Sequence, residues 1–352
     1  MTRLLSGHQG NSDAAAAFLH FVDQRQRAFV QKYKGRQPFT ENSVLARKWF
    51  TNMYRECDRG TAFFKRNILT TVLAGAKRGP SAPIDVNLVR KVVFRSILYR
   101  LINKLETFEN FGCVPGEEDF SSFISFLRGL KEEGSTIFTA AHQNMGFDRL
   151  MVTFKYTRQN IKTLSRQVVE AAEMRSLKKI QEVFQTIPNV GGFFAWQMLC
   201  DLLEARVLGE CTDNQWTCLG PGAKNGLSRI FGRHSLNLTR VMRDLSAHSG
   251  PRSGFLALGI EFPAFLGRPL SLKNVEHALC EFDKYYRGAL AIPVKERLYT
   301  ETTSRTNLDM TASCSSCQRE AGASRIVCPP CGGVWHRWHF CLIYTCANYI
   351  CD

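Results

Sequence analysis

The chain has 352 residues, and 44% of them are hydrophobic, which is enough for a sizeable core in one large or two ordinary domains. Its 46 Lys and Arg against 31 Asp and Glu give a net charge of +15, which favours a polyanionic partner such as DNA over an indifferent basic surface. No apolar run approaches the roughly 18 residues that a membrane helix needs, and the N-terminus lacks a hydrophobic signal core, so we expect an intracellular protein with no membrane partner.

The first part of the chain is expected to be a disordered lead followed by helices. Residues 1–17 are small and polar, and from Phe18 the apolar spacing predicts a helix with a basic outer face. Ser43 is placed to cap a second helix that runs into the sequence NMYRECDRGT. There Asp58 could anchor Arg55 or Arg59, and a surface charge cluster at a helix end is an equally good interpretation.

A strongly periodic helix is predicted next, with Asp85 as its cap and an apolar face that ends at Leu105. Its arginines, Arg100 among them, must occupy the other sides, where some could contact phosphates, although a solvated face is the default for such residues. Further helices are predicted over 118–130, 148–171, 175–185, 236–248 and 272–287. The fold class is therefore all-α, with a helical body over residues 18–292.

The centre of the chain combines two glycine-rich turns with an acidic loop. The sequence IPNVGG, residues 187–192, suits a hairpin with outward N–H groups that can hold a phosphate, and an apolar helix follows it. Asp213 and Asn214 lie in the next loop, and GPGAKNG then opens another helix, whose N-terminus supplies a second group of amides. The alternative is a helical hairpin in a core with an ordinary aspartate. The predicted DNA contacts are Asn189, Val190, Gly191, Gly192, Gly220, Gly222 and Lys224, with Arg55, Arg59 and Arg100.

The C-terminal residues predict a metal site. Residues 293–313 are a polar linker, and seven of the 13 cysteines lie in the last 39 residues, which favours metal over disulfides in a reducing compartment. Two CxxC pairs followed by two histidines resemble the opening of a PHD-type zinc finger, so the tail at 314–352 is expected to bind structural zinc. A histidine replaces one expected cysteine and the last pair is too widely spaced, so a degraded finger is the alternative. The predicted ligands are Cys314, Cys317, Cys328, Cys331, His336, His339 and Cys341.

The hairpin, the helix and the aspartate come in an order that resembles the helix-hairpin-helix DNA glycosylase superfamily, whose hairpin reads LPGVGxxTA. This resemblance implies a glycosylase-like helical body with Asp213 as the catalytic aspartate. Phe193 stands where the lyase members carry a lysine nucleophile, so a Schiff-base mechanism is not expected.

Two longer blocks resemble the helical domain of phage 5-hydroxymethyl-deoxyuridine DNA kinases, which also occurs in the alpha-glutamyl/putrescinyl thymine pyrophosphorylase family. They read NxYRExDRxT at residues 52–61 and EHxLCEFDKY at residues 276–285. The resemblance implies action on a hypermodified thymine flipped out of DNA, in which an amine displaces pyrophosphate from the 5-methylene group. The candidate catalytic residues are Asp213, Asn214, His277 and Glu281.

The chain contains no GxxxxGK[ST] phosphate-binding pattern, so it is not expected to be a kinase by itself. Two other functions stay open: a monofunctional DNA glycosylase, and a non-catalytic DNA-binding module that docks a chromatin or histone partner through the tail. A nuclear location is expected.

Overall fold

The computed structural model describes residues 12–69, 72–74, 76, 83–139, 145–231 and 268–289, together with the backbone of two short strands at 325–327 and 334–336. The chain forms two compact units. The first unit consists of Met1–Asp58 and Leu219–Asp352, and the second of Arg59–Cys218. Each unit has its own hydrophobic core.

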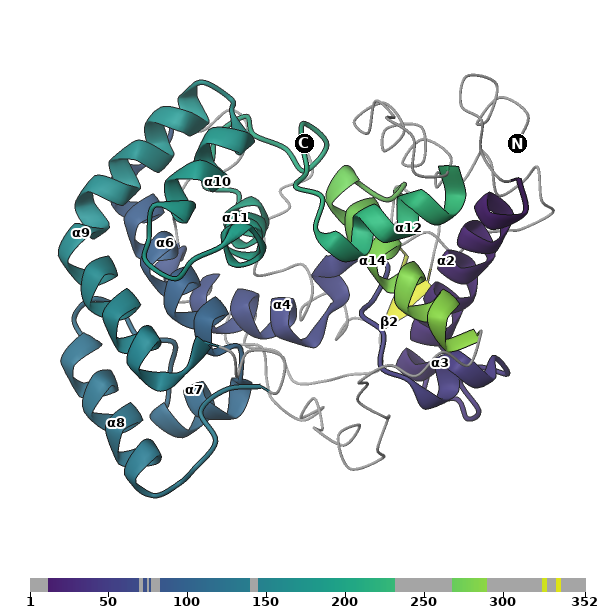
Figure 1. Ribbon diagram of the computed structural model, residues 1–352, viewed down its shortest axis with the longest axis horizontal. Coiled ribbons are helices and arrows are strands. Elements are labelled where there is room, and N and C mark those ends of the chain that lie inside the picture. The colour runs from purple at the N-terminus through teal and green to yellow at the C-terminus, as the bar shows by residue number, and fades with distance from the viewer. Residues whose placement is uncertain are drawn as a thin grey trace. The chain divides into compact units, whose positions relative to one another are not determined.

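The first unit joins the start of the chain to its later helices. Helix α14 is in contact with α2, α3 and α12 (Figure 1). The rings of Phe18 and Phe282 meet edge to face with their centroids 5.4 Å apart, which shows how closely α2 packs on α14. The helices are α2 (Ser12–Tyr33), α3 (Ser43–Arg47), the short 3-10 helix η1 (Arg55–Cys57), α12 (Pro221–Phe231) and α14 (Leu272–Ala289).

Two sequence predictions for this unit need correction. Helix α2 begins at Ser12, inside the segment predicted as a disordered lead, because Ala14 and Ala15 are buried in the core. Helix α3 is only five residues long. Its cap is Asn42 rather than Ser43: the Asn42 Oδ1 accepts hydrogen bonds from the N–H groups of Val44 and Leu45 at 3.0 and 3.1 Å. The residues after the short α3 form the irregular segment that builds the candidate site.

Helices α12 and α14 approach each other closely because α12 presents glycines at the contact. A Cβ atom at Gly222 would lie 2.4 Å from the Cys280 Sγ, and one at Gly226 would lie 2.3 Å from the Leu279 carbonyl oxygen. A side chain at Gly226 would meet backbone, and one at Gly222 would require the Cys280 side chain to move. These glycines thus serve helix packing.

The second unit is helical throughout the part that the structure describes. Helix α6 packs against α9 and α11, and α10 also contacts both α9 and α11 (Figure 1). Asp85 caps α6 as predicted, since its Oδ1 accepts from the Asn87 N–H at 2.8 Å. The elements are α4 (Arg59–Phe64), the π-helix η2 (Lys65–Leu69), α6 (Val86–Ile102), α7 (Leu105–Phe111), α8 (Phe120–Glu132), α9 (Phe147–Glu173), α10 (Leu177–Gln185) and α11 (Gly192–Ala205).

Arg100 is not a surface cation of α6. Its Nε donates to the Asp201 Oδ2 at 2.7 Å, and the Ser96 hydroxyl donates to the same oxygen at 2.8 Å. Burial alone would lower the pKa of Arg100, but the charge and hydrogen bonds of Asp201 outweigh it and raise the pKa above its usual value. The prediction that Arg100 contacts DNA phosphates is therefore wrong.

In the C-terminal tail, β1 (Arg325–Val327) and β2 (Val334–His336) pair antiparallel, with Arg325 opposite His336. The all-α class is confirmed for the described residues of the body, which form helices and connecting segments. None of the described helices has both the length and the apolar character needed to cross a bilayer.

Candidate functional site

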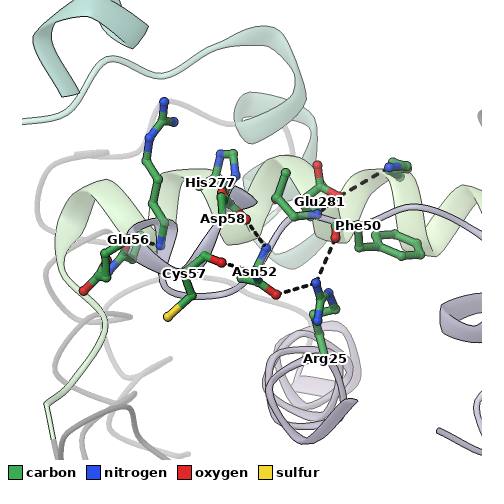
Figure 2. A network of polar contacts seen from close by, with 12 residues as sticks. Arg25, Phe50, Asn52, Glu56, Cys57, Asp58, His277 and Glu281 are labelled. Carbon is green, nitrogen blue, oxygen red and sulfur yellow. Dashed lines mark hydrogen bonds and ion pairs between the residues drawn. The ribbon is translucent and has the colours of Figure 1, made fainter. Parts of the chain in front are cut away.

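A polar cluster in the first unit joins the two sequence blocks that lie far apart in the chain (Figure 2). The first block forms a tight loop after α3. The Asn52 N–H donates to the Asp58 Oδ1 at 2.7 Å, and the Asn52 Nδ2 donates to the Cys57 carbonyl at 2.7 Å. These two bonds fix the Asp58 carboxylate at the end of the loop, facing α14.

His277 of α14 faces this carboxylate. Its Nε2 lies 3.6 Å from the Asp58 Oδ2, which is an ion-pair distance when the imidazole is protonated. The Nε2 atom is buried and makes no hydrogen bond to any described residue, while the side chain as a whole stays 17% exposed. A histidine with one nitrogen against a carboxylate and an edge open to solvent is suited to accept and return a proton.

Arg25 of α2 holds the loop from the other side. Its Nη2 donates to the Asn52 Oδ1 at 2.6 Å and to the Phe50 carbonyl at 2.9 Å (Figure 2). Burial lowers the pKa of Arg25, and the negative charges of Asp58 and Glu281 oppose that shift. The sequence patterns did not identify Arg25 as a site residue. The signal for its role was an arginine at an inward position of that helix.

Glu281 lies one turn after His277 on α14, and spacing of four residues places both on one helix face. Its carboxylate accepts from the Thr51 N–H at 3.3 Å and from the Lys284 Nζ at 3.4 Å. Glu281 therefore positions the segment that carries Asn52, and its catalytic role stays a prediction.

The charged residues of the first block make different contacts from those predicted. Asp58 binds Asn52 and faces His277 instead of anchoring Arg55 or Arg59. Arg55 is buried, and its backbone N–H donates to the Asn274 Oδ1 at 3.0 Å, so the prediction of an exposed phosphate contact is wrong for Arg55. Arg59 belongs to the second unit, where its partly exposed side chain pairs with Glu106 at 3.1 Å.

The hairpin before α11 forms in the second unit, but its backbone conformation differs from the one expected. Asn189 takes the left-handed conformation (φ 64°), whereas Gly191 has an ordinary φ of −84° and caps α11. The Val190 N–H donates to the Ile187 carbonyl at 3.1 Å, so this amide is used within the turn. The Asn189 Nδ2 bonds the Thr153 hydroxyl at 3.2 Å, which ties the turn to α9.

The four predicted catalytic residues divide between the units. Asp213 and Asn214 lie in a turn of the second unit, where Asp213 is half-buried and Asn214 is exposed. His277 and Glu281 belong to the first unit, in the cluster with Asp58. The structure thus brings together only the second pair.

The N-terminus of α12 is occupied by a carboxylate of its own unit. The Gly220 N–H, predicted to face a phosphate, donates to the Glu276 Oε1 at 3.3 Å, and Gly222 packs on Cys280. The Gly220 amide is therefore used within its own unit, while the role of Gly222 in anion binding stays a prediction. Lys224 in the first turn of α12 is exposed, in keeping with its predicted contact with DNA.

The predicted zinc ligands are almost all outside the described residues. His336 lies in β2, and Cys314, Cys317, Cys328, Cys331, His339 and Cys341 are not among the residues that the structure describes. Within the described part, no group of three or more His, Cys, Asp or Glu side chains could hold a metal ion. The zinc site stays a prediction.

Comparison with known proteins identifies a family whose model covers both blocks. Residues 12–292 match the family model described as the helical domain of 5-hmdU DNA kinase, and both blocks lie inside that match. The 5-hmdU DNA kinase of Bacillus phage SP10 is 25% identical over 294 residues, which cover 76% of this chain and 44% of the relative. The chain therefore spans less than half of that relative. No solved structure matches significantly, so the glycosylase-like superfamily stays a prediction.

Proposed function

We propose, since the chain belongs to the family of 5-hmdU DNA kinase helical domains, that it acts on DNA carrying 5-hydroxymethyluracil or a derivative, at the modified base. The name of the phage relative supports the substrate class, and the net charge of +15 supports a polyanionic partner. The observation that carries the proposal is the pairing of Asp58 with His277, because it unites the two blocks that identify the family.

In this proposal, Asp58 and His277 form the acid/base centre. One Asp58 oxygen is fixed by the Asn52 amide, and the other faces the His277 Nε2. This arrangement favours the tautomer with the proton on Nε2, which leaves Nδ1 to accept a proton. The carboxylate then stabilises the imidazolium ion that forms.

The proposed reaction is displacement at the 5-methylene group of a base flipped out of the duplex. An amine nitrogen forms the new bond to the methylene carbon, the bond from that carbon to the pyrophosphate oxygen breaks, and the amine proton passes to His277. Positive charge develops on the methylene carbon as pyrophosphate leaves, and a nearby carboxylate would stabilise it.

Asp213 is the candidate for an alternative acidic centre within the second unit, where part of its side chain is open to solvent. The hairpin around Asn189, together with Arg59 and Lys224, would contribute the phosphate contacts. The structural zinc, the chromatin partner and the nuclear location also stay predictions.

The test is mass spectrometry of nucleosides from DNA incubated with the protein. The DNA should carry 5-hydroxymethyluracil or its pyrophosphorylated derivative, with a small diamine as the nucleophile and thymine-only DNA as the control. We expect a new nucleoside from the derivative, and far less of it with His277→Gln. An unchanged nucleoside profile on every modified DNA would contradict the proposed chemistry.

A second candidate function is a non-catalytic module that binds the modified DNA, which the net charge of +15 supports. The same experiment separates the two functions when a binding assay accompanies it. Preferential binding of modified DNA with no new nucleoside would identify a binding module.

A further inference from the structure

A small basic cavity lies in the first unit, beside the cluster described above. It has a volume of about 50 Å³, and its lining comes from α2, α3 and the residues that flank α3. A water molecule needs only about 10–15 Å³, while pockets for drug-sized ligands measure about 300–1,000 Å³. The cavity therefore has room for one small group and not for a nucleoside. Its lining residues are Arg25, Ala28, Lys32, Phe39, Leu45, Lys48, Trp49 and Phe50.

The lining combines three cations with three aromatic rings. Three of the lining side chains are cations and none is an acid, which is the charge pattern that an anion requires. The Lys32 Nζ lies 4.0 Å from the centre of the Phe39 ring. That contact orients the ammonium group without neutralising its charge.

Arg25 supplies hydrogen-bond donors to this cavity. A guanidinium group has five N–H donors, and the bonds of Arg25 to Phe50 and Asn52 both come from Nη2. Within the part of the chain that the structure describes, Nε and Nη1 of Arg25 make no hydrogen bond. The charges of Asp58 and Glu281 act on Arg25 from the side of the polar cluster.

Lys32 lies close enough to Arg25 for their charges to repel each other. Partial burial, followed by repulsion from Arg25, lowers the pKa of Lys32 from 10.5 to about 8. An anion between the two groups would remove that repulsion.

We propose that this cavity binds a phosphate group, held by the guanidinium of Arg25 and the ammonium groups of Lys32 and Lys48. The Nε and Nη1 groups of Arg25 can each donate a single hydrogen bond to a phosphate oxygen, and the lysines add charge. The phosphate could belong to the DNA backbone or to free pyrophosphate, since both present the same oxygens. This inference does not rest on the proposed base chemistry.

The experiment uses the full chain and measures pyrophosphate binding by calorimetry, with and without a saturating DNA duplex. Lys32→Gln and Lys48→Gln each remove a lining charge, and Lys34→Gln is the matched control, because Lys34 is exposed just beyond α2 and does not line the cavity. Loss of a charge-assisted bond should weaken binding about tenfold or more, whereas a screened surface charge should change it by less than about twofold.

Each result decides between sources or overturns the inference. If DNA abolishes pyrophosphate binding, the cavity binds a backbone phosphate. The same conclusion follows if both cavity variants lose affinity for DNA but not for pyrophosphate. Pyrophosphate binding that persists beside DNA assigns it to a free ligand. If neither ligand distinguishes the two cavity variants from Lys34→Gln, the cavity does not bind phosphate. No base modification is measured, so the outcome is separate from that of the proposed function.

Discussion

Arg100 of α6 and Asp201 of α11 form a buried ion pair in the core of the second unit, with less than a tenth of either side chain exposed. Removal of one partner leaves an uncompensated charge in the core, which costs about 3–5 kcal/mol of unfolding free energy. We therefore expect Arg100→Met to lower stability by that amount in urea denaturation. The double replacement Arg100→Met with Asp201→Leu should recover most of the loss. A stable single variant with weakened DNA binding would instead favour the surface role predicted from the sequence.

This ion pair also shows what the sequence could not predict. The spacing of apolar residues predicted the position of α6 well. However, α6 is buried on nearly all sides, so it has no solvent-exposed polar face. The partner of Arg100 comes from a helix far away in the sequence. The same holds for Asp58 and His277. The sequence blocks identified both residues, but the loop that turns Asp58 toward α14 depends on contacts between chain segments far apart in the sequence.

The glycine contact of α12 with α14 predicts that two helical glycines respond differently to replacement by alanine. Gly226→Ala would place a methyl group against the Leu279 backbone, which cannot move aside without shifting α14, so we expect a loss of about 1–3 kcal/mol. Gly129→Ala in α8 is the matched control, because its Cβ would meet nothing within 4 Å. That variant should be stabilised by up to about 1 kcal/mol. Equal melting temperatures for both variants would show that α12 and α14 are not in close contact.

The pKa of Lys32 predicts how phosphate binding in the cavity depends on pH. Lys32 is charged below about pH 8 and neutral above it, so pyrophosphate affinity should fall as the pH rises from 7 to 9. The other cations that line the cavity are Arg25 and Lys48. Lys32→Arg keeps its charge, and comparison with it cancels the titration of pyrophosphate itself. Parallel pH profiles for the two proteins would remove Lys32 from the binding site.

Lys224 predicts a change in the salt dependence of DNA binding. It is exposed in the first turn of α12, and each phosphate contact releases about one counterion. Lys224→Ala should therefore reduce the slope of log affinity against log salt by about one, with a similar loss of affinity for all sequences. Lys131→Ala serves as the control, because Lys131 already pairs with Asp148 at 3.4 Å. The contact with DNA would be refuted by identical slopes for Lys224→Ala and wild type.

The most direct test of the account compares product formation by His277→Gln and Asp213→Asn on DNA that carries the pyrophosphorylated base. Both substitutions keep the approximate size and the polar character of the side chain, so thermal unfolding should be close to that of the wild type. The Asp58–His277 centre predicts a rate loss of about 10²–10⁴-fold for His277→Gln, as for other positioned acid/base groups. It predicts a smaller loss for Asp213→Asn. Undiminished turnover by His277→Gln, with activity lost only in Asp213→Asn, would contradict the account and move the chemistry to the second unit.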